Sequence, residues 1–318
     1  MTARRLSAFE ALGRGLANLR GNLALVAASA LGALVVLGLA LLSLLPMLTL
    51  VGLSLADLAA GAEGPRAVRA IQDFDAARLF SGEALVAALL LLAGLTLASL
   101  VQCWFQAGIL GVLAAGDAQA PPGPRRPALA FRTFSPRFFS AEAARLFGRV
   151  LAFYMLVLGA VIAGLAVVLA LVVIAASAAG RWGGGAAFAV GCGGAIPLLF
   201  GFFVLALAAS FGQADLPRAG GSARAALATG LRTLSQRMGS SLGLYLLFLA
   251  AAIAVGVFQG GLNLASGAAF GSASPAGATA QVALFGFQTF AQALLGVALA
   301  ATAIALVRAE RAAAEPEG

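Results

Sequence analysis

The sequence predicts an all-α membrane protein, a polytopic helical bundle with about six transmembrane helices. Of its 318 residues, 62% are hydrophobic and only 10% are charged, and the mean hydropathy is +1.01. Soluble domains average about 45–50% apolar and about 25% charged residues. So few charged side chains cannot cover the surface of a soluble chain of this length, whereas lipid can cover an apolar surface.

Six apolar runs supply the spans. A spanning helix needs about 20 mostly apolar residues, because each residue adds about 1.5 Å across a hydrocarbon core about 30 Å thick. The runs contain no Asp, Glu, Lys or Arg, and they are residues 23–45, 84–105, 151–176, 186–210, 242–262 and 283–307. We expect residues 1–318 to form a single membrane domain. The first run continues well beyond a cleavage-like Ala28-Ser29-Ala30, which favours an uncleaved span over a signal peptide.

An amphipathic segment precedes each pair of spans. These segments are residues 6–22, 136–150 and 223–238, each with apolar side chains at helical spacing and arginines on the remaining faces. Such helices lie in the headgroup plane, so we predict three cytoplasmic interfacial helices. Residues 11–19 also match residues 226–234 at five of nine positions. The sequence therefore indicates a repeated architecture, an amphipathic helix followed by two spans.

The arginines predict the orientation. The 20 basic residues are all Arg. With a cytoplasmic N-terminus, sixteen of them lie in inside segments, and only Arg66, Arg69, Arg78 and Arg181 lie outside. Because cytoplasmic loops carry the excess of basic residues, both termini are expected to be cytoplasmic. The Ala-, Gly- and Arg-rich, Lys-free composition is typical of a GC-rich bacterial genome, so we expect the bacterial inner membrane.

Arginines beside the spans are candidate lipid-binding residues. We predict that six of them contact anionic headgroups: Arg14, Arg20, Arg132, Arg137, Arg232 and Arg237. Residues 131–139, Phe-Arg-Thr-Phe-Ser-Pro-Arg-Phe-Phe, interleave arginine with aromatic rings, a pattern that also binds single-stranded nucleic acid. Beside a membrane, the rings enter the headgroup layer and the guanidiniums meet phosphates. We therefore expect membrane lipids and no nucleic acid as partners.

Polar side chains inside the spans are neutral. Gln288 and Gln292 are four residues apart and share one face of the sixth span. They are candidates for the polar lining of a substrate path. The alternative, which we favour, is hydrogen bonding between helices, worth about 0.6–2 kcal/mol per bond.

The absence of several residue types argues against an enzyme. Without His, the chain lacks the commonest general base, His-based zinc motifs and Ser-His-Asp triads. Without Lys, it has no P-loop. Cys103 and Cys192 are isolated thiols in apolar surroundings, which favours neither a disulfide nor a metal site. We expect no catalytic, cofactor-binding or metal-binding residues.

A few motifs resemble a known group of proteins. Phe105-Gln106-Ala107-Gly108-Ile109-Leu110-Gly111 leaves the second span before a basic loop, Ala214-Asp215 follows the fourth span, and an amphipathic segment at 222–238 leads into the fifth. This layout resembles the YciC-type six-span bacterial membrane proteins and the membrane domain attached to some glycerophosphodiester phosphodiesterases. The resemblance implies a six-helix membrane fold. It carries over no catalytic residue, because the phosphodiesterase chemistry belongs to a separate soluble domain.

Two classes of function fit these observations. The first is a non-enzymatic envelope scaffold or accessory protein that contacts lipids or a partner membrane protein. The second is a transporter or permease component for a neutral or lipidic substrate. Ion-coupled transporters usually carry ionisable groups inside their spans, and the six runs contain no acidic or basic residue. We expect the first class.

Overall fold

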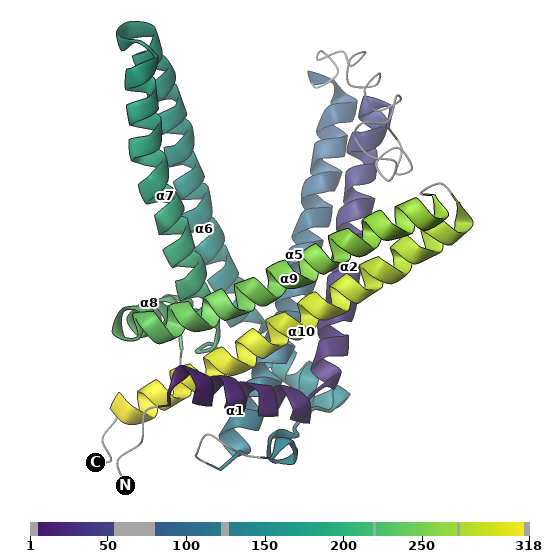
Figure 1. Ribbon diagram of the computed structural model, residues 1–318, viewed down its shortest axis with the longest axis vertical. Helices are drawn as coiled ribbons and strands as arrows, with labels where there is room; N and C mark the ends of the chain where they lie inside the picture. Colours follow the sequence, from purple (N-terminus) through teal and green to yellow (C-terminus); the bar gives the residue numbers. More distant parts are fainter. Residues whose placement is uncertain (1–5, 54–79, 122–126, 219–220, 272–273, 315–318) are drawn as a thin grey trace. The chain divides into compact units, whose positions relative to one another are not determined.

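The computed structural model describes residues 6–53, 80–121, 127–218, 221–271 and 274–314. These residues form α-helices and one short 3₁₀ helix and contain no strand, which confirms the all-α prediction (Figure 1). The elements are α1 (Ala8–Gly21), α2 (Ala24–Val51), α5 (Gly82–Gln119), η2 (Ala128–Phe131), α6 (Pro136–Trp182), α7 (Gly184–Gln213), α8 (Ala223–Gln236), α9 (Met238–Phe270) and α10 (Pro275–Ala314).

Six of the described helices, α2, α5, α6, α7, α9 and α10, are long and apolar enough to cross a membrane. Each of them overlaps one of the six predicted runs, and the chain is a multi-pass membrane protein. In five of them, at most 17% of the most apolar window is buried, so most of that surface is left for lipid. In α10 the buried share is 61%, because α1, α7 and α9 all pack against it.

Local sequence explains where the short helices begin. Ser7 and Glu10 form a capping box at the start of α1, each side chain accepting a hydrogen bond from the other residue's backbone N–H. Ser222 caps α8, where its hydroxyl oxygen accepts a hydrogen bond from the backbone N–H of Ala225. The two helices lie where amphipathic segments were predicted.

The second amphipathic segment is not a separate helix, contrary to the sequence-based expectation. Ser135 caps a helix that begins at Pro136 and runs without interruption to Trp182, through the third span. No glycine cap or proline separates residues 136–150 from the span, so nothing in the sequence ends the helix there. The helix ends at Gly183, whose φ of +86° is a conformation that favours glycine.

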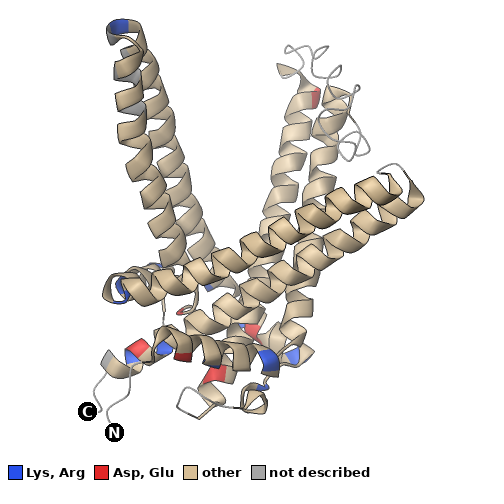
Figure 2. Cartoon of the chain, in the orientation of Figure 1, with Lys and Arg blue, Asp and Glu red and all other residues tan. Residues whose placement is uncertain are grey.

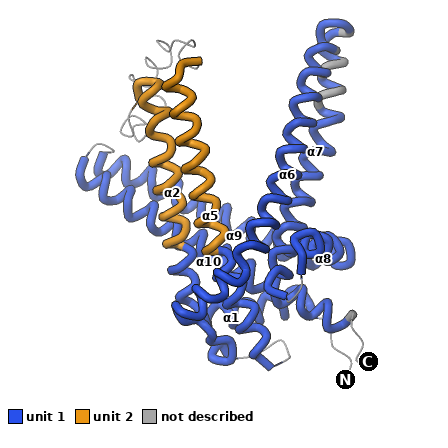
Figure 3. Tube along the Cα trace, turned by 180° about the vertical axis from the view of Figure 1, so that it is seen from behind, with its two compact units in different colours: residues 1–29, 106–318 blue, residues 30–105 orange. Residues whose placement is uncertain are grey.

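The chain divides into two compact units (Figure 3). One unit is residues 30–105, and the other is residues 1–29 with 106–318. In the first unit, α2 and α5 pack closely where a Cβ on Gly94 would lie only 2.2 Å from the Cβ of Ser43. The prediction of a single domain stays a prediction.

In the larger unit, each amphipathic segment packs on the second span of another pair. The start of α6 lies on α5, where the Phe139 ring covers Gly108. Helix α8 lies on α7, with Gly230 against the backbone of Ala208, and α1 lies on α10 through Gly15. The amphipathic segment before the second pair of spans thus packs on the second span of the first pair, and the segment before the third pair packs on the second span of the second pair. Helix α1, which precedes the first pair, packs on the second span of the third pair.

Candidate functional site

A buried ion-pair network surrounds Asp117, two residues before the end of α5. Arg14 Nε donates to Asp117 Oδ1 at 2.5 Å, and Arg308 Nη1 donates to Oδ2 at 2.8 Å. Arg14 Nη2 also donates to the Asp117 carbonyl at 3.0 Å. Asp117 and Arg14 are 1% and 5% exposed, whereas about half of the Arg308 side chain is accessible. The network therefore joins α1, α5 and α10 in one contact.

A second group of ion pairs joins the C-terminal turns of α10 to α7 and α8. Arg311 pairs with Asp215 and donates to the Thr229 hydroxyl at 3.0 Å. Arg237, between α8 and α9, pairs with Glu310. Burial raises the pKa of the Asp215 carboxyl, against the lowering effects of the Thr229 hydrogen bond and the Arg218 charge. Cations near a helix C-terminus also interact favourably with the helix dipole.

Two asparagines, one on α1 and one at its C-cap, bond to α5 and to residues 131–134, which precede α6. Asn18 donates to the Leu113 carbonyl at 2.9 Å, and Asn22 donates to the Phe131 carbonyl at 2.6 Å. The Asn22 carbonyl oxygen accepts from the backbone N–H groups of Thr133 and Phe134 at 3.0 and 2.9 Å. Both asparagine side chains are thereby satisfied although they are almost fully buried.

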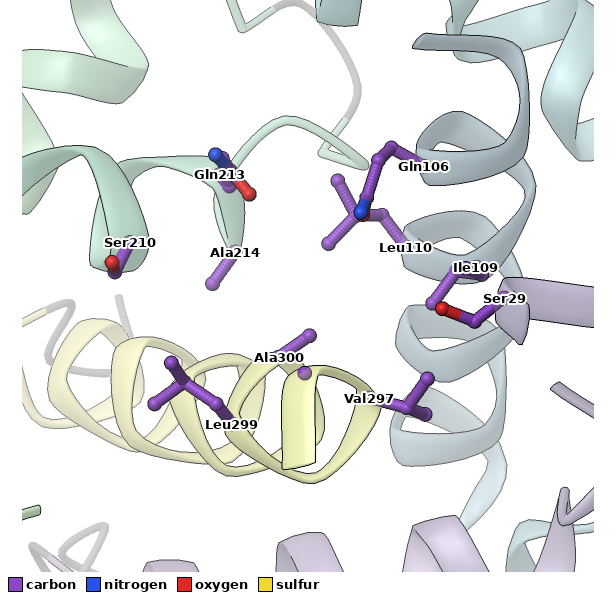
Figure 4. Close-up of a pocket in the computed structure, with 11 residues that line it drawn as sticks. Ser29, Gln106, Ile109, Leu110, Ser210, Gln213, Ala214, Val297, Leu299 and Ala300 are labelled. Carbon is purple, nitrogen blue, oxygen red and sulfur yellow. The ribbon is translucent and has the colours of Figure 1, made fainter. Parts of the chain in front are cut away.

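A small cavity of about 190 Å³ lies among α5, α7 and α10 (Figure 4). Gln106 and Gln213 line it from α5 and α7, and Val297 and Ala300 line it from α10. Neither glutamine amide bonds to a residue that the structure describes. The lining contains no charged side chain. The volume is below the roughly 300–1,000 Å³ of drug-sized ligand pockets, but it is enough for several water molecules.

A basic groove of about 320 Å³ lies where α1 passes into α2. Arg20 and Arg132 both line it and are exposed, and neither pairs with any residue in the described ranges. Leu23 and Leu129, 57% and 78% exposed, provide an apolar margin. We call this feature the Arg20–Arg132 groove.

The structure separates the six predicted headgroup arginines into two groups. Arg14 is buried against Asp117, and Arg237 is tied to Glu310 and to the Leu6 carbonyl. Their guanidiniums bind partners inside the protein, contrary to the headgroup contacts predicted for these two arginines. The remaining four are exposed and unpaired within the described residues: Arg20, Arg132, Arg137 and Arg232.

The two predicted lining glutamines do not act together. Gln288 accepts a hydrogen bond from Gln259 of α9 at 2.6 Å, which joins the last two spans. Gln292 is exposed and does not line the cavity. The contact of Gln288 is of the inter-helix kind that the sequence favoured.

Sequence reasoning missed Asp117 and Asp215 as structural centres. Each is the first acidic residue after a long apolar span, and that position is a signal that could have identified them. The arginines that pair with them are 103 and 96 residues away for Arg14 and Arg311, so no local pattern contains the pair. Within the described residues, no group of His, Cys, Asp and Glu could hold a metal ion.

Comparisons with known protein families, curated proteins and solved structures find no match to this chain. The resemblance to YciC-type proteins therefore stays a prediction.

Proposed function

We propose that this chain is a non-enzymatic accessory or scaffold protein of a bacterial inner membrane that contacts anionic lipids and a partner membrane protein. One observation carries the proposal: the buried charged side chains among the described residues, Arg14, Asp117 and Asp215, pair within the protein. These charges join helices, whereas the unpaired arginines are exposed. The exposed surface of the protein, and not its buried charges, is therefore what contacts lipid or a partner protein.

The distribution of charge supports an orientation. In the larger unit, the described charged residues lie in α1, in α8, in the connections between helices and near the ends of the spanning helices (Figure 2). Arg181 lies in the last turn of α6, whereas Arg137, Arg145 and Arg149 lie near its start. The positive-inside rule then favours cytoplasmic N- and C-termini. Cysteines introduced at Ser140 and Ala179, in a background without Cys103 and Cys192, report the two sides. External labelling of Ser140→Cys and protection of Ala179→Cys would reverse the orientation.

Purification in mild detergent tests the accessory role. We expect native mass spectrometry to show retained anionic phospholipid, and crosslinking in cells to capture a recurrent membrane protein partner. A purified chain that retains neither lipid nor partner, and that hydrolyses or transfers a substrate unaided, would overturn the proposal.

A transporter for a neutral substrate is the second candidate, and the cavity favours it. The unpaired amides of Gln106 and Gln213 offer donors and acceptors without charge, as a neutral polar solute requires. Leucine at both positions removes these groups with little change in volume. If the cavity is part of a path, uptake of a neutral solute into proteoliposomes falls in the double variant. If liposomes with the wild-type protein and liposomes with the double variant both take up no more solute than protein-free liposomes, the transporter proposal is contradicted.

A further inference from the structure

We infer that the Arg20–Arg132 groove binds the phosphate of an anionic phospholipid. The inference rests on the proposed function, which supplies lipid contact in general, and it assigns that contact to one site. Arg20 lies in the last turn of α1, and Arg132 follows η2, so the groove is lined by two arginines that are 112 positions apart in the sequence.

The first argument is electrostatic. Two like charges line one groove, and no acidic side chain lines it with them. An anion between the guanidiniums would replace this repulsion with two charge-assisted interactions. Guanidinium presents N–H groups in a planar fork that matches the oxygens of phosphate, so arginine is suited to this ligand.

The second argument is preorganisation. Asn22 lies in the groove lining, and its side chain bonds to the backbone of Phe131, Thr133 and Phe134. These hydrogen bonds hold the segment that carries Arg132 against the α1–α2 junction that carries Arg20. A ligand therefore binds both arginines without the conformational-entropy cost of ordering a loop.

The third argument separates a lipid from a soluble anion. The groove includes Leu23 and Ala24, and Ala24 is the first residue of the spanning helix α2. Leu129, from η2, also lines the groove and is 78% exposed. A phosphate held by the arginines would therefore have apolar surface beside it, where acyl chains can pack. Free phosphate would use the arginines and leave this apolar margin uncovered.

The test compares groove arginines with exposed arginines elsewhere. The variants are Arg20→Gln, Arg132→Gln and the double variant, and the matched controls are Arg137→Gln and Arg232→Gln. Each protein is exchanged into nanodiscs of phosphatidylglycerol and phosphatidylcholine, and retained phosphatidylglycerol is measured by native mass spectrometry. We expect roughly a fivefold loss for each groove variant and a larger loss for the double variant, with the controls near wild type.

Three outcomes overturn the inference alone. If all four single variants lose lipid equally, the arginines act as a diffuse basic surface. If the wild-type protein binds inorganic phosphate without lipid as tightly as it binds phosphatidylglycerol, the ligand is a soluble anion. If the double variant retains as much lipid as wild type, the groove is not the site, although lipid contact as a function survives. Failure of the wild type to retain any anionic lipid would remove the proposed lipid contact as well.

Discussion

Replacing Asp117 by Asn tests whether the buried network holds the larger unit together. The change leaves the Arg14 guanidinium, which is 5% exposed, without its carboxylate partner. Removing one partner of a buried ion pair typically destabilises a protein by about 3–5 kcal/mol, because the remaining charge is desolvated and unpaired. For a chain of this size, that corresponds to a fall in apparent melting temperature on the order of 10 °C. Fluorescence-detected size exclusion after heating in detergent measures the shift.

Arg308→Gln is the matched control in the same network. About half of the Arg308 side chain is accessible, so solvent already screens its attraction to Asp117. We expect a loss of no more than about 1 kcal/mol. Replacing both buried partners, as Arg14→Met with Asp117→Leu, should recover much of the stability because no buried charge remains. Equal melting temperatures for wild type and Asp117→Asn, or an equally large loss for Arg308→Gln, would refute this reasoning.

Three further predictions concern packing and hydrogen bonding. Gly15→Ala places a Cβ 2.7 Å from the backbone of α10 and should lower the melting temperature. Gly13→Ala, with open space around it, should raise the melting temperature slightly. Equal shifts in the two variants would contradict the close α1–α10 contact. Asn22→Ala leaves the backbone partners of Asn22 at Phe131, Thr133 and Phe134 unpaired, at about 1–3 kcal/mol, and should speed hydrogen exchange in residues 127–135. Unchanged protection would argue against the role of Asn22. Gln259→Leu should destabilise by about 0.6–2 kcal/mol, and adding Gln288→Leu should change thermal stability little further; additive losses would mean that the amides act separately.

The spans could be predicted because their signal is local. A run of about 20 apolar residues crosses a bilayer wherever it occurs in a chain, so composition alone locates each of the six helices. The start of α1 was likewise encoded by neighbours, since Ser7 and Glu10 satisfy each other's backbone N–H groups. The misplaced boundary at residues 136–150 shows the limit of this reasoning. Amphipathic and fully apolar segments share the same backbone geometry, and a change of polarity does not by itself end a helix.

The roles of the arginines depended on tertiary structure. Arg14 and Arg20 lie six residues apart on α1 and looked equivalent as basic residues beside a span. Packing of α1 across α5 and α10 buries Arg14 against Asp117 and leaves Arg20 in a groove with Arg132. Sequence by itself determined that the chain is a multi-pass helical membrane protein, because hydrophobicity acts through each helix alone. Only the packing of distant helices decided which charges became internal ion pairs and which stayed exposed, because a buried charge requires a partner that the local sequence does not contain.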